Sequence, residues 1–162
     1  MKNRILLLLP LLILLATGCP IGLDSPLGEL GKEKIDERLI GSWHCLDTES
    51  EVQRVEIAKS DKNSYRVKVV EKGEMYALET DILKGWVTTV KEKNFVFFQP
   101  EGDLKFYHYC YWWDGSSLIT CDLALLDGGV ETVTDTKSFR AQVERSIVKD
   151  EWGKETTEWV SE

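Results

Sequence analysis

The pattern that most restricts the fold is an alternation of apolar and polar side chains beyond residue 40. Val55 and Ile57 alternate with charged residues, and Tyr65, Val67 and Val69 do the same in the next apolar run. Successive side chains of a β-strand point to opposite faces of the sheet. The pattern therefore predicts strands that bury one face and expose the other to water.

Turn-forming residues separate these runs at intervals of about ten residues, a spacing typical of consecutive antiparallel hairpins. They fall at residues 60–63, 72–73, 84–85, 91–94, 100–103 and 114–116. The spacing predicts roughly eight strands between residues 40 and 127. No helical segment long enough for a crossover interrupts them, and closing the sheet on itself removes its exposed edges. We therefore expect a mainly β fold, an antiparallel up-and-down barrel.

The apolar period changes near the C-terminus. A helix at about residues 136–151 would carry an apolar stripe formed by Phe139, Val143 and Ile147. One of residues 134–136 would cap its start, and Gly153 would end it. Because the stripe must be buried, we expect this helix to pack on the barrel wall. Residues 158–161 fit either a short last strand or a frayed end.

The beginning of the chain has the layout of a secretory signal peptide. Lys2 and Arg4 precede an apolar run at residues 5–15, and small residues follow it. The run is shorter than the roughly 20 apolar residues of a membrane-spanning helix. Residues 16–19, Ala-Thr-Gly-Cys, resemble the bacterial lipobox, in which small residues precede a lipidated cysteine. The alternative is ordinary cleavage after Gly18 and a freely secreted protein.

The lipobox resemblance implies that residues 1–18 are removed and that Cys19 is acylated, which anchors the chain in a lipid bilayer. Several acyl chains, palmitate among them, hold a protein firmly. Pro20 stands where aspartate commonly marks retention in the inner membrane, so the resemblance implies the periplasmic leaflet of the outer membrane if the source is Gram-negative. Residues 19–36 would form a flexible tether to a single domain at residues 37–162.

The chain is acidic, with 20 basic and 28 acidic residues. Removing residues 1–18 takes away two basic residues and no acid, which leaves 18 against 28 and a formal net charge of −10. Nucleic-acid binding depends on basic patches, so this charge argues against a nucleic-acid partner. It argues equally against electrostatic adhesion to anionic lipid.

The densest aromatic segment, residues 106–113, leads into a predicted two-residue turn at Gly115-Ser116. Counting outward from this turn pairs Trp112 with Ile119, Cys110 with Cys121 and His108 with Leu123. We assign the more apolar face to the barrel interior; it carries Phe106, His108, Cys110, Trp112, Ile119, Cys121, Leu123 and Leu125. The other face carries Tyr107, Tyr109, Tyr111, Trp113, Thr120 and Asp122. A shift of one residue would exchange the two faces.

Gly41-Ser42-Trp43 matches the Gly-x-Trp motif of the lipocalin superfamily, which lies at the start of the first strand. With strands first and one helix near the end, the chain resembles a small bacterial lipoprotein with a lipocalin-like barrel. The resemblance implies that Trp43 closes the bottom of the barrel. The late-strand Arg that packs on this Trp in lipocalins is either absent or replaced by another contact, because no Arg occurs between Arg66 and Arg140.

Three cysteines remain for the domain. Cys45 shares strand parity with Trp43, so an inward Trp43 would place Cys45 inside the barrel with Cys110 and Cys121. The envelope is oxidising, and we expect a disulfide that joins Cys121 to either Cys110 or Cys45. The third thiol would be a small buried hydrophobe. His44 points away from Cys45, which argues against a catalytic pair, and no metal-ligand spacing such as C-x-x-C supports a metal site.

An eight-stranded barrel is either filled by its own side chains or holds one small ligand. The leading hypothesis is a non-enzymatic barrel that binds a small apolar or amphipathic molecule, with Trp43, Trp112 and His108 lining the interior and His108 as its polar group. The alternative is a filled barrel that binds an enzyme or an envelope-assembly partner through an exposed tyrosine row, unless the helix covers that row. The sequence contains no G-x-S-x-G, P-loop or HExxH motif, so we expect neither an enzyme nor a cofactor.

Overall fold

The computed structural model of the chain describes residues 21–123, 126–150 and 152–162. The lipidation site predicted at Cys19 lies outside these residues. The described elements are, in chain order, η1 (Glu37–Leu39), β1 (Gly41–Cys45), β2 (Val52–Asp61), β3 (Ser64–Lys72), β4 (Ile82–Val90), β5 (Lys93–Pro100), β6 (Tyr107–Asp114), β7 (Ser117–Asp122), η2 (Val130–Thr132), α1 (Thr136–Ser146) and β8 (Thr157–Ser161).

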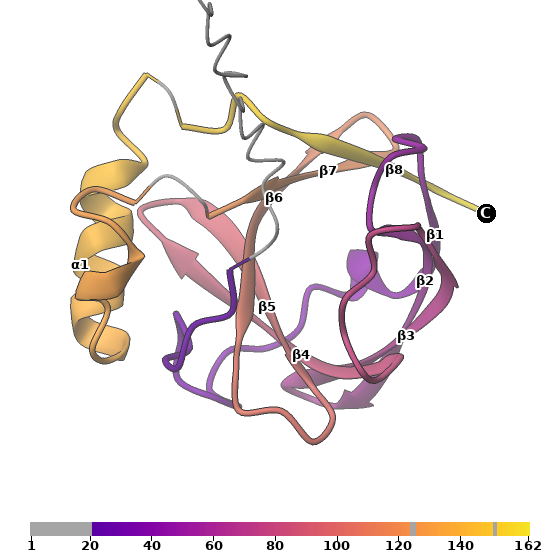
Figure 1. Cartoon of the computed structure of the whole chain (residues 1–162), viewed down its shortest axis with the longest axis horizontal. Helices are drawn as coiled ribbons and strands as arrows, with labels where there is room; N and C mark the ends of the chain where they lie inside the picture. Colours follow the sequence, from indigo (N-terminus) through magenta and orange to yellow (C-terminus); the bar gives the residue numbers. More distant parts are fainter. Residues whose placement is uncertain (1–20, 124–125, 151) are drawn as a thin grey trace, which may run out of the picture.

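The eight strands close into a barrel in which each strand pairs antiparallel with the next (Figure 1). β8 completes the ring by pairing with β7 on one side and with β1 on the other, where Cys45 lies opposite Trp159. The predicted up-and-down barrel is therefore confirmed. β1 to β7 lie between residues 40 and 127, and the remaining strand is the C-terminal segment that the sequence left as a strand or a frayed end.

One predicted turn, at residues 84–85, is wrong because these residues lie inside β4. Gly85 pairs there with Tyr65 on β3 and with Phe98 on β5. A Cβ atom at Gly85 would stand 2.9 Å from the Phe98 ring, so the glycine makes room for that ring. A glycine within a strand often marks such a close approach.

The register of the β6–β7 hairpin agrees with the prediction. Cys110 lies opposite Cys121, and Gly115 holds the first turn position with φ +59°. The predicted assignment of faces is wrong. The tyrosine face of β6 lines the barrel interior, whereas His108 and Cys110 lie on the outer side of the wall.

The barrel wall separates two apolar cores. The inner core fills part of the barrel and is formed by Leu39, Trp43, Ile57, Tyr65, Val67, Val69, Leu83, Val87, Val96, Tyr111 and Leu118. The outer core includes Leu23, Leu27, Trp86, Val90, Phe95, Phe97, Phe106, Cys110, Cys121, Leu123, Phe139, Val143 and Ile147. Because α1 and the N-terminal segment cover this side, β4, β5 and β6 carry apolar residues on both faces.

α1 packs on the outer core through its predicted stripe, in which Phe139 and Val143 are fully buried. The side chain of Asp135 caps the helix by accepting a hydrogen bond from the Ser138 N–H at 2.8 Å. The helix is shorter than predicted and ends at Ser146. The next position of the stripe after Ile147 is a glutamate, so a longer helix would bury no further apolar side chain.

The described part of the segment that we expected to be a flexible tether packs on the barrel. Leu23 exchanges two backbone hydrogen bonds with Phe106, and Leu27 is fully buried in the outer core. Arg140 of α1 donates hydrogen bonds to the carbonyl oxygens of Leu27 and Thr89, at 3.3 and 2.8 Å. Two leucines thus fix a segment whose proline, glycine and charge content favoured a linker.

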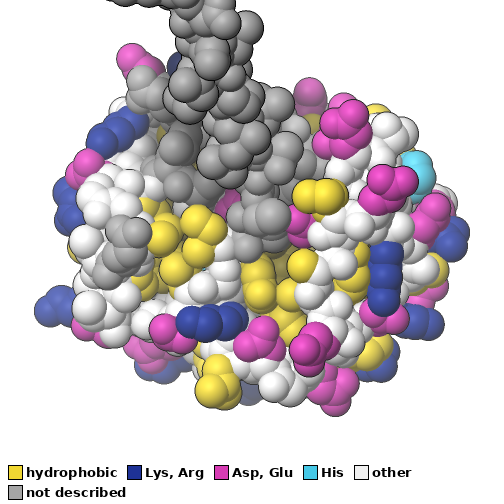
Figure 2. Space-filling model, in the orientation of Figure 1, with side chains coloured by type: hydrophobic (Ala, Val, Ile, Leu, Met, Phe, Trp, Pro, Cys, Tyr) yellow, Lys and Arg dark blue, Asp and Glu magenta, His cyan; other side chains and the backbone are white. Residues whose placement is uncertain are grey.

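The surface carries both signs of charge, interspersed over the face shown in Figure 2. Exposed ion pairs join neighbouring segments, among them Lys72 with Asp81 at 2.5 Å and Lys105 with Asp24 at 2.7 Å. In the described residues, no helix has both the length and the apolar character needed to cross a membrane.

Candidate functional site

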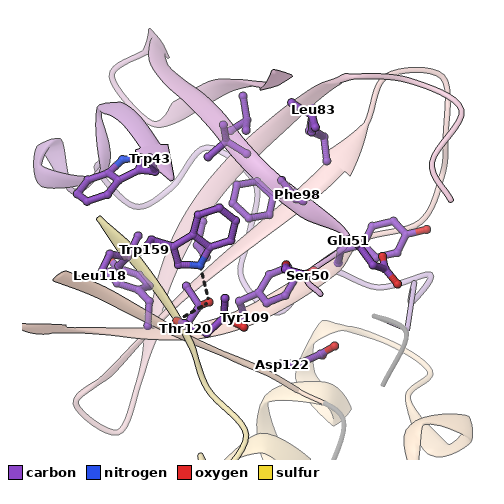
Figure 3. A pocket seen from close by; sticks show the side chains of 18 of the residues that line it. Trp43, Ser50, Glu51, Leu83, Phe98, Tyr109, Leu118, Thr120, Asp122 and Trp159 are labelled. Atoms are coloured by element: carbon purple, nitrogen blue, oxygen red, sulfur yellow. Dashed lines mark hydrogen bonds between the residues drawn. The ribbon is translucent and has the colours of Figure 1, made fainter. Parts of the chain in front are cut away.

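The barrel contains a cavity of about 550 Å³. Small-molecule sites commonly measure about 300–1,000 Å³. Figure 3 shows Trp43 at one end of it and Glu51 and Asp122 toward the other. We call the first end, closed by Leu39 and Trp43, the floor. We call the second end the mouth; it is formed by Asp47, Glu51, Met75, Tyr107, Asp122 and Glu155.

The floor is built around Trp43, whose indole N–H donates a hydrogen bond to the Leu39 carbonyl at 2.9 Å. Gly41 has φ +148°, a conformation that favours glycine, where the chain passes from η1 into β1. The ring of Trp113 packs 5.7 Å from that of Trp43, and the Arg38 guanidinium lies 5.0 Å from the Trp113 ring. An arginine–tryptophan contact therefore exists here, made by an arginine that precedes the first strand.

Two tyrosines complete the floor through Asp36. The Tyr65 hydroxyl donates to the Asp36 carbonyl at 2.9 Å, and the Tyr111 hydroxyl donates to the Asp36 carboxylate at 3.3 Å. Burial raises the pKa of both tyrosines. Burial also raises the pKa of Asp36, but hydrogen bonds from Arg38 outweigh it and hold that pKa below its usual value. The indole N–H of Trp43 and the hydroxyls of Tyr65 and Tyr111 thus all have partners at the floor, whereas the buried indole N–H of Trp113 has none among the described residues.

The walls between floor and mouth are apolar. They are formed mainly by Val55, Ile57, Val67, Val69, Leu83, Val96, Phe98, Leu118 and Trp159. The indole N–H of Trp159 donates to the Thr120 hydroxyl at 3.0 Å, which fixes this ring against β7 (Figure 3). An apolar ligand here would gain roughly 25 cal/mol for each Å² of apolar surface removed from water.

The mouth is acidic. Burial, together with the negative charges of Glu51 and Glu155, raises the pKa of Asp122 to about 6. Burial also raises the pKa of Tyr109, and the negative charges of Asp122 and Glu51 add to this increase. Among the described residues that line the cavity, none is lysine, arginine or histidine. The opening therefore presents carboxylates and tyrosine hydroxyls without a basic side chain.

Of the three residues predicted to line the interior, only Trp43 does so. His108 lies on the outer side of the wall, 3% exposed, with its ring 5.7 Å from Phe97 and 4.7 Å from Phe139. Trp112 faces outward and is 37% exposed. Both faces of β6 carry aromatic side chains, so a comparison of how apolar the two faces are could not identify the one that lines the interior. Tyr111 fits inside because its hydroxyl donates to the Asp36 carboxylate at the floor.

The three described cysteines are free thiols, and the expected disulfide is not present. Cys45 shares the inner face with Trp43, whereas Cys110 and Cys121 belong to the outer core, so the three do not line one interior. β8 lies between β7 and β1, which separates Cys45 from Cys121. Burial raises the pKa of Cys110 to about 11 and also raises the pKa of the other two thiols.

The sequence did not predict the residues that make the mouth acidic and aromatic. Tyr109 and Asp122 were placed on the outer face, although a tyrosine row that ends beside an aspartate is a signal for a polar-tipped interior. Glu51 and Glu155 carried no signal, because they lie on connections that meet only when β8 closes the barrel.

No protein-family model, curated protein or solved structure matches the chain. Within the described residues, no group of three or more histidine, cysteine or acidic side chains is arranged to hold a metal ion. The chemistry of the cavity is therefore argued from the residues that line it.

Proposed function

We propose that the protein is a lipid-anchored envelope lipoprotein whose lipocalin-like barrel binds one small apolar or amphipathic molecule without transforming it. The observation that carries this proposal is the cavity of about 550 Å³, with apolar walls and one open end. Apolar walls with a few polar groups at one end are typical of small-molecule sites. The Gly-x-Trp motif supports the family, because Gly41 and Trp43 occupy the start and floor of the barrel.

Binding is tested by the fluorescence of Trp43 and Trp159, which both line the cavity. Titration of the purified protein with fatty acids, lysolipids, long-chain amines and tetrapyrroles should give a saturable change with at least one class. Val69→Phe, which points into the cavity, should abolish that response. Val70→Phe, on the outer face of the same strand, should leave it intact. No saturable response to any of these ligands would exclude the proposal.

The proposed anchor is an acylated Cys19, in the periplasmic leaflet of the outer membrane if the source is Gram-negative. The lipobox resemblance at residues 16–19 supports it. Cys19→Ser should abolish labelling of the expressed protein by a palmitate analogue, whereas Cys45→Ser should retain the label. Labelling that persists in Cys19→Ser would refute the anchor without touching the binding proposal.

The alternative, a protein-binding barrel with a filled core, would present a loop or an aromatic surface, such as an exposed tyrosine row, to its partner. Tyr107, Tyr109 and Tyr111 line the cavity instead, so this row offers no outer surface to a partner. On the outer face of the same strand, His108 and Cys110 are buried in or against the outer core, and Trp112 is 37% exposed. We therefore propose the small-molecule function alone.

A further inference from the structure

We infer that the cavity selects amphiphiles with a cationic head group, such as long-chain amines or quaternary ammonium compounds, over fatty acids and other anions. The tail would lie along the apolar walls toward Trp43, and the head group would stand at the mouth between Glu51 and Asp122. This inference rests on the proposed function and names the class of ligand for the same cavity.

The first observation is the gradient of polarity along the cavity. The floor is closed by Trp43 and Leu39, 5% and 2% exposed, and the Trp43 indole N–H and the Tyr65 hydroxyl are already hydrogen-bonded there. The carboxylates lie at the opposite end, beside the opening (Figure 3). A linear amphiphile therefore fits in one orientation, with the head group at the mouth.

The second observation is the sign of the charge at that end. Four acidic residues line the mouth: Asp47, Glu51, Asp122 and Glu155. None of them forms an ion pair with a residue in the described ranges. Burial and like charge disfavour the ionised form of Asp122, and a bound cation would relieve that cost. An anionic head group would increase the free-energy cost of ionising Asp122.

Basic side chains at this end of the barrel do not offset the acids. Lys72 is held by Asp81 at 2.5 Å, and Lys105 is held by Asp24 at 2.7 Å. Neither lines the cavity. A carboxylate ligand would thus enter a mouth whose lining contains no basic side chain and beside which Lys72 is already paired with Asp81, so binding it would bury poorly compensated negative charge.

The third observation is the aromatic character of the mouth. Tyr76, Tyr107 and Tyr109 line it beside the acids. Aromatic rings attract cations through their faces, and such rings recur in sites for quaternary ammonium groups. The protein already makes one such contact here, since the Lys72 ammonium lies 4.8 Å from the centre of the Tyr76 ring. The described acids do not form a metal site, which favours an organic cation.

The test compares dodecyltrimethylammonium with dodecanoate, which share a chain length, on the purified protein below micellar concentrations. Tryptophan fluorescence should show that the cation binds at least about tenfold more tightly at pH 7. Asp122→Asn and Glu51→Gln should each reduce that preference by about three- to fivefold. Glu56→Gln is the matched control, because it removes the same charge from the exposed outer face of β2.

The outcomes separate the two proposals. Equal or tighter binding of dodecanoate would overturn the charge preference and leave the small-molecule function standing. An equal loss in Glu56→Gln and Asp122→Asn would assign the preference to the overall negative charge and would also overturn the inference. If neither probe nor any ligand class saturates, the proposed function itself fails. The comparison on the unmodified protein stands even if a variant does not fold.

Discussion

His108 and Phe139 join the barrel wall to α1 by an edge-to-face contact, with ring centroids 4.7 Å apart and planes at 86°. Neither ring nitrogen of His108 forms a hydrogen bond of acceptable geometry within the described residues, although the Phe106 backbone acts on the ring and favours its protonated form. Burial lowers the pKa of His108 to about 3, so the imidazole is neutral at physiological pH. The contact between wall and helix thus contains a buried polar ring whose hydrogen-bonding capacity is unused.

His108→Leu should therefore stabilise the protein at pH 7, by about 1–3 kcal/mol, because leucine carries no unpaired polar atoms into the outer core. The measurement is urea unfolding followed by circular dichroism. His44→Leu is the control, since it removes the half-exposed histidine of β1. A destabilised His108→Leu would mean that the imidazole has a hydrogen-bond partner after all.

His108 should also make the folded protein less stable at acidic pH. Its pKa is about 3 in the folded chain and about 6.5 in the unfolded chain, so the unfolded state binds the proton first. The stability contributed by the neutral ring is complete above pH 6.5 and is lost as the pH falls toward 3, by on the order of 4 kcal/mol. The slope of stability against pH in this window should be shallower in His108→Leu than in the unmodified protein.

The hairpin of β6 and β7 shows how far local sequence determined the fold. Gly115-Ser116 specifies a two-residue turn, and the turn alone fixes the pairing of Cys110 with Cys121. The faces could not be chosen in this way, because β6 is covered on both sides. Which face is inner depends on α1 and β8, whose docking no local pattern describes.

The turn between β4 and β5 carries backbone strain that can be relieved. Lys91 and Glu92 have φ of +44° and +66°, a region that side chains with a Cβ atom rarely adopt. Glu92→Gly should stabilise the protein by about 1 kcal/mol, measured by thermal unfolding. Gly115→Ala, at φ +59° in the other tight turn, should destabilise it by a similar amount. Equal melting temperatures for the three proteins would rule out strain at these positions.

Asp122 should make stability fall as the pH rises. Its pKa is raised from 3.8 to about 6, so the folded state holds the proton that the unfolded state has released. Stability is therefore lost between about pH 4 and pH 6, the direction opposite to that of His108. The charged and titratable groups that face Asp122 are Glu51, Glu155 and Tyr109.

Asp122→Asn should remove this slope, which makes the variant more stable than the unmodified protein at pH 7 by on the order of 3 kcal/mol and little different at pH 4. Urea unfolding at both pH values measures it, with Glu56→Gln as the control for net charge. Saturating dodecyltrimethylammonium should lower the pKa of Asp122, observed by carboxyl NMR. A pKa that stays near 6 with the cation bound would place the head group away from this carboxylate.

Phe98 lines the cavity and packs closely against Gly85. A methyl group on residue 85 would stand 2.9 Å from the Phe98 ring, so Gly85→Ala should push the ring into the cavity. We expect this to cost about 1–3 kcal/mol of stability and to weaken ligand binding severalfold. Phe98→Leu removes the obstructing ring, so the double variant should recover most of both losses. Additive effects in this cycle would show that the two residues do not interact, and that the size of the cavity is set elsewhere on the wall.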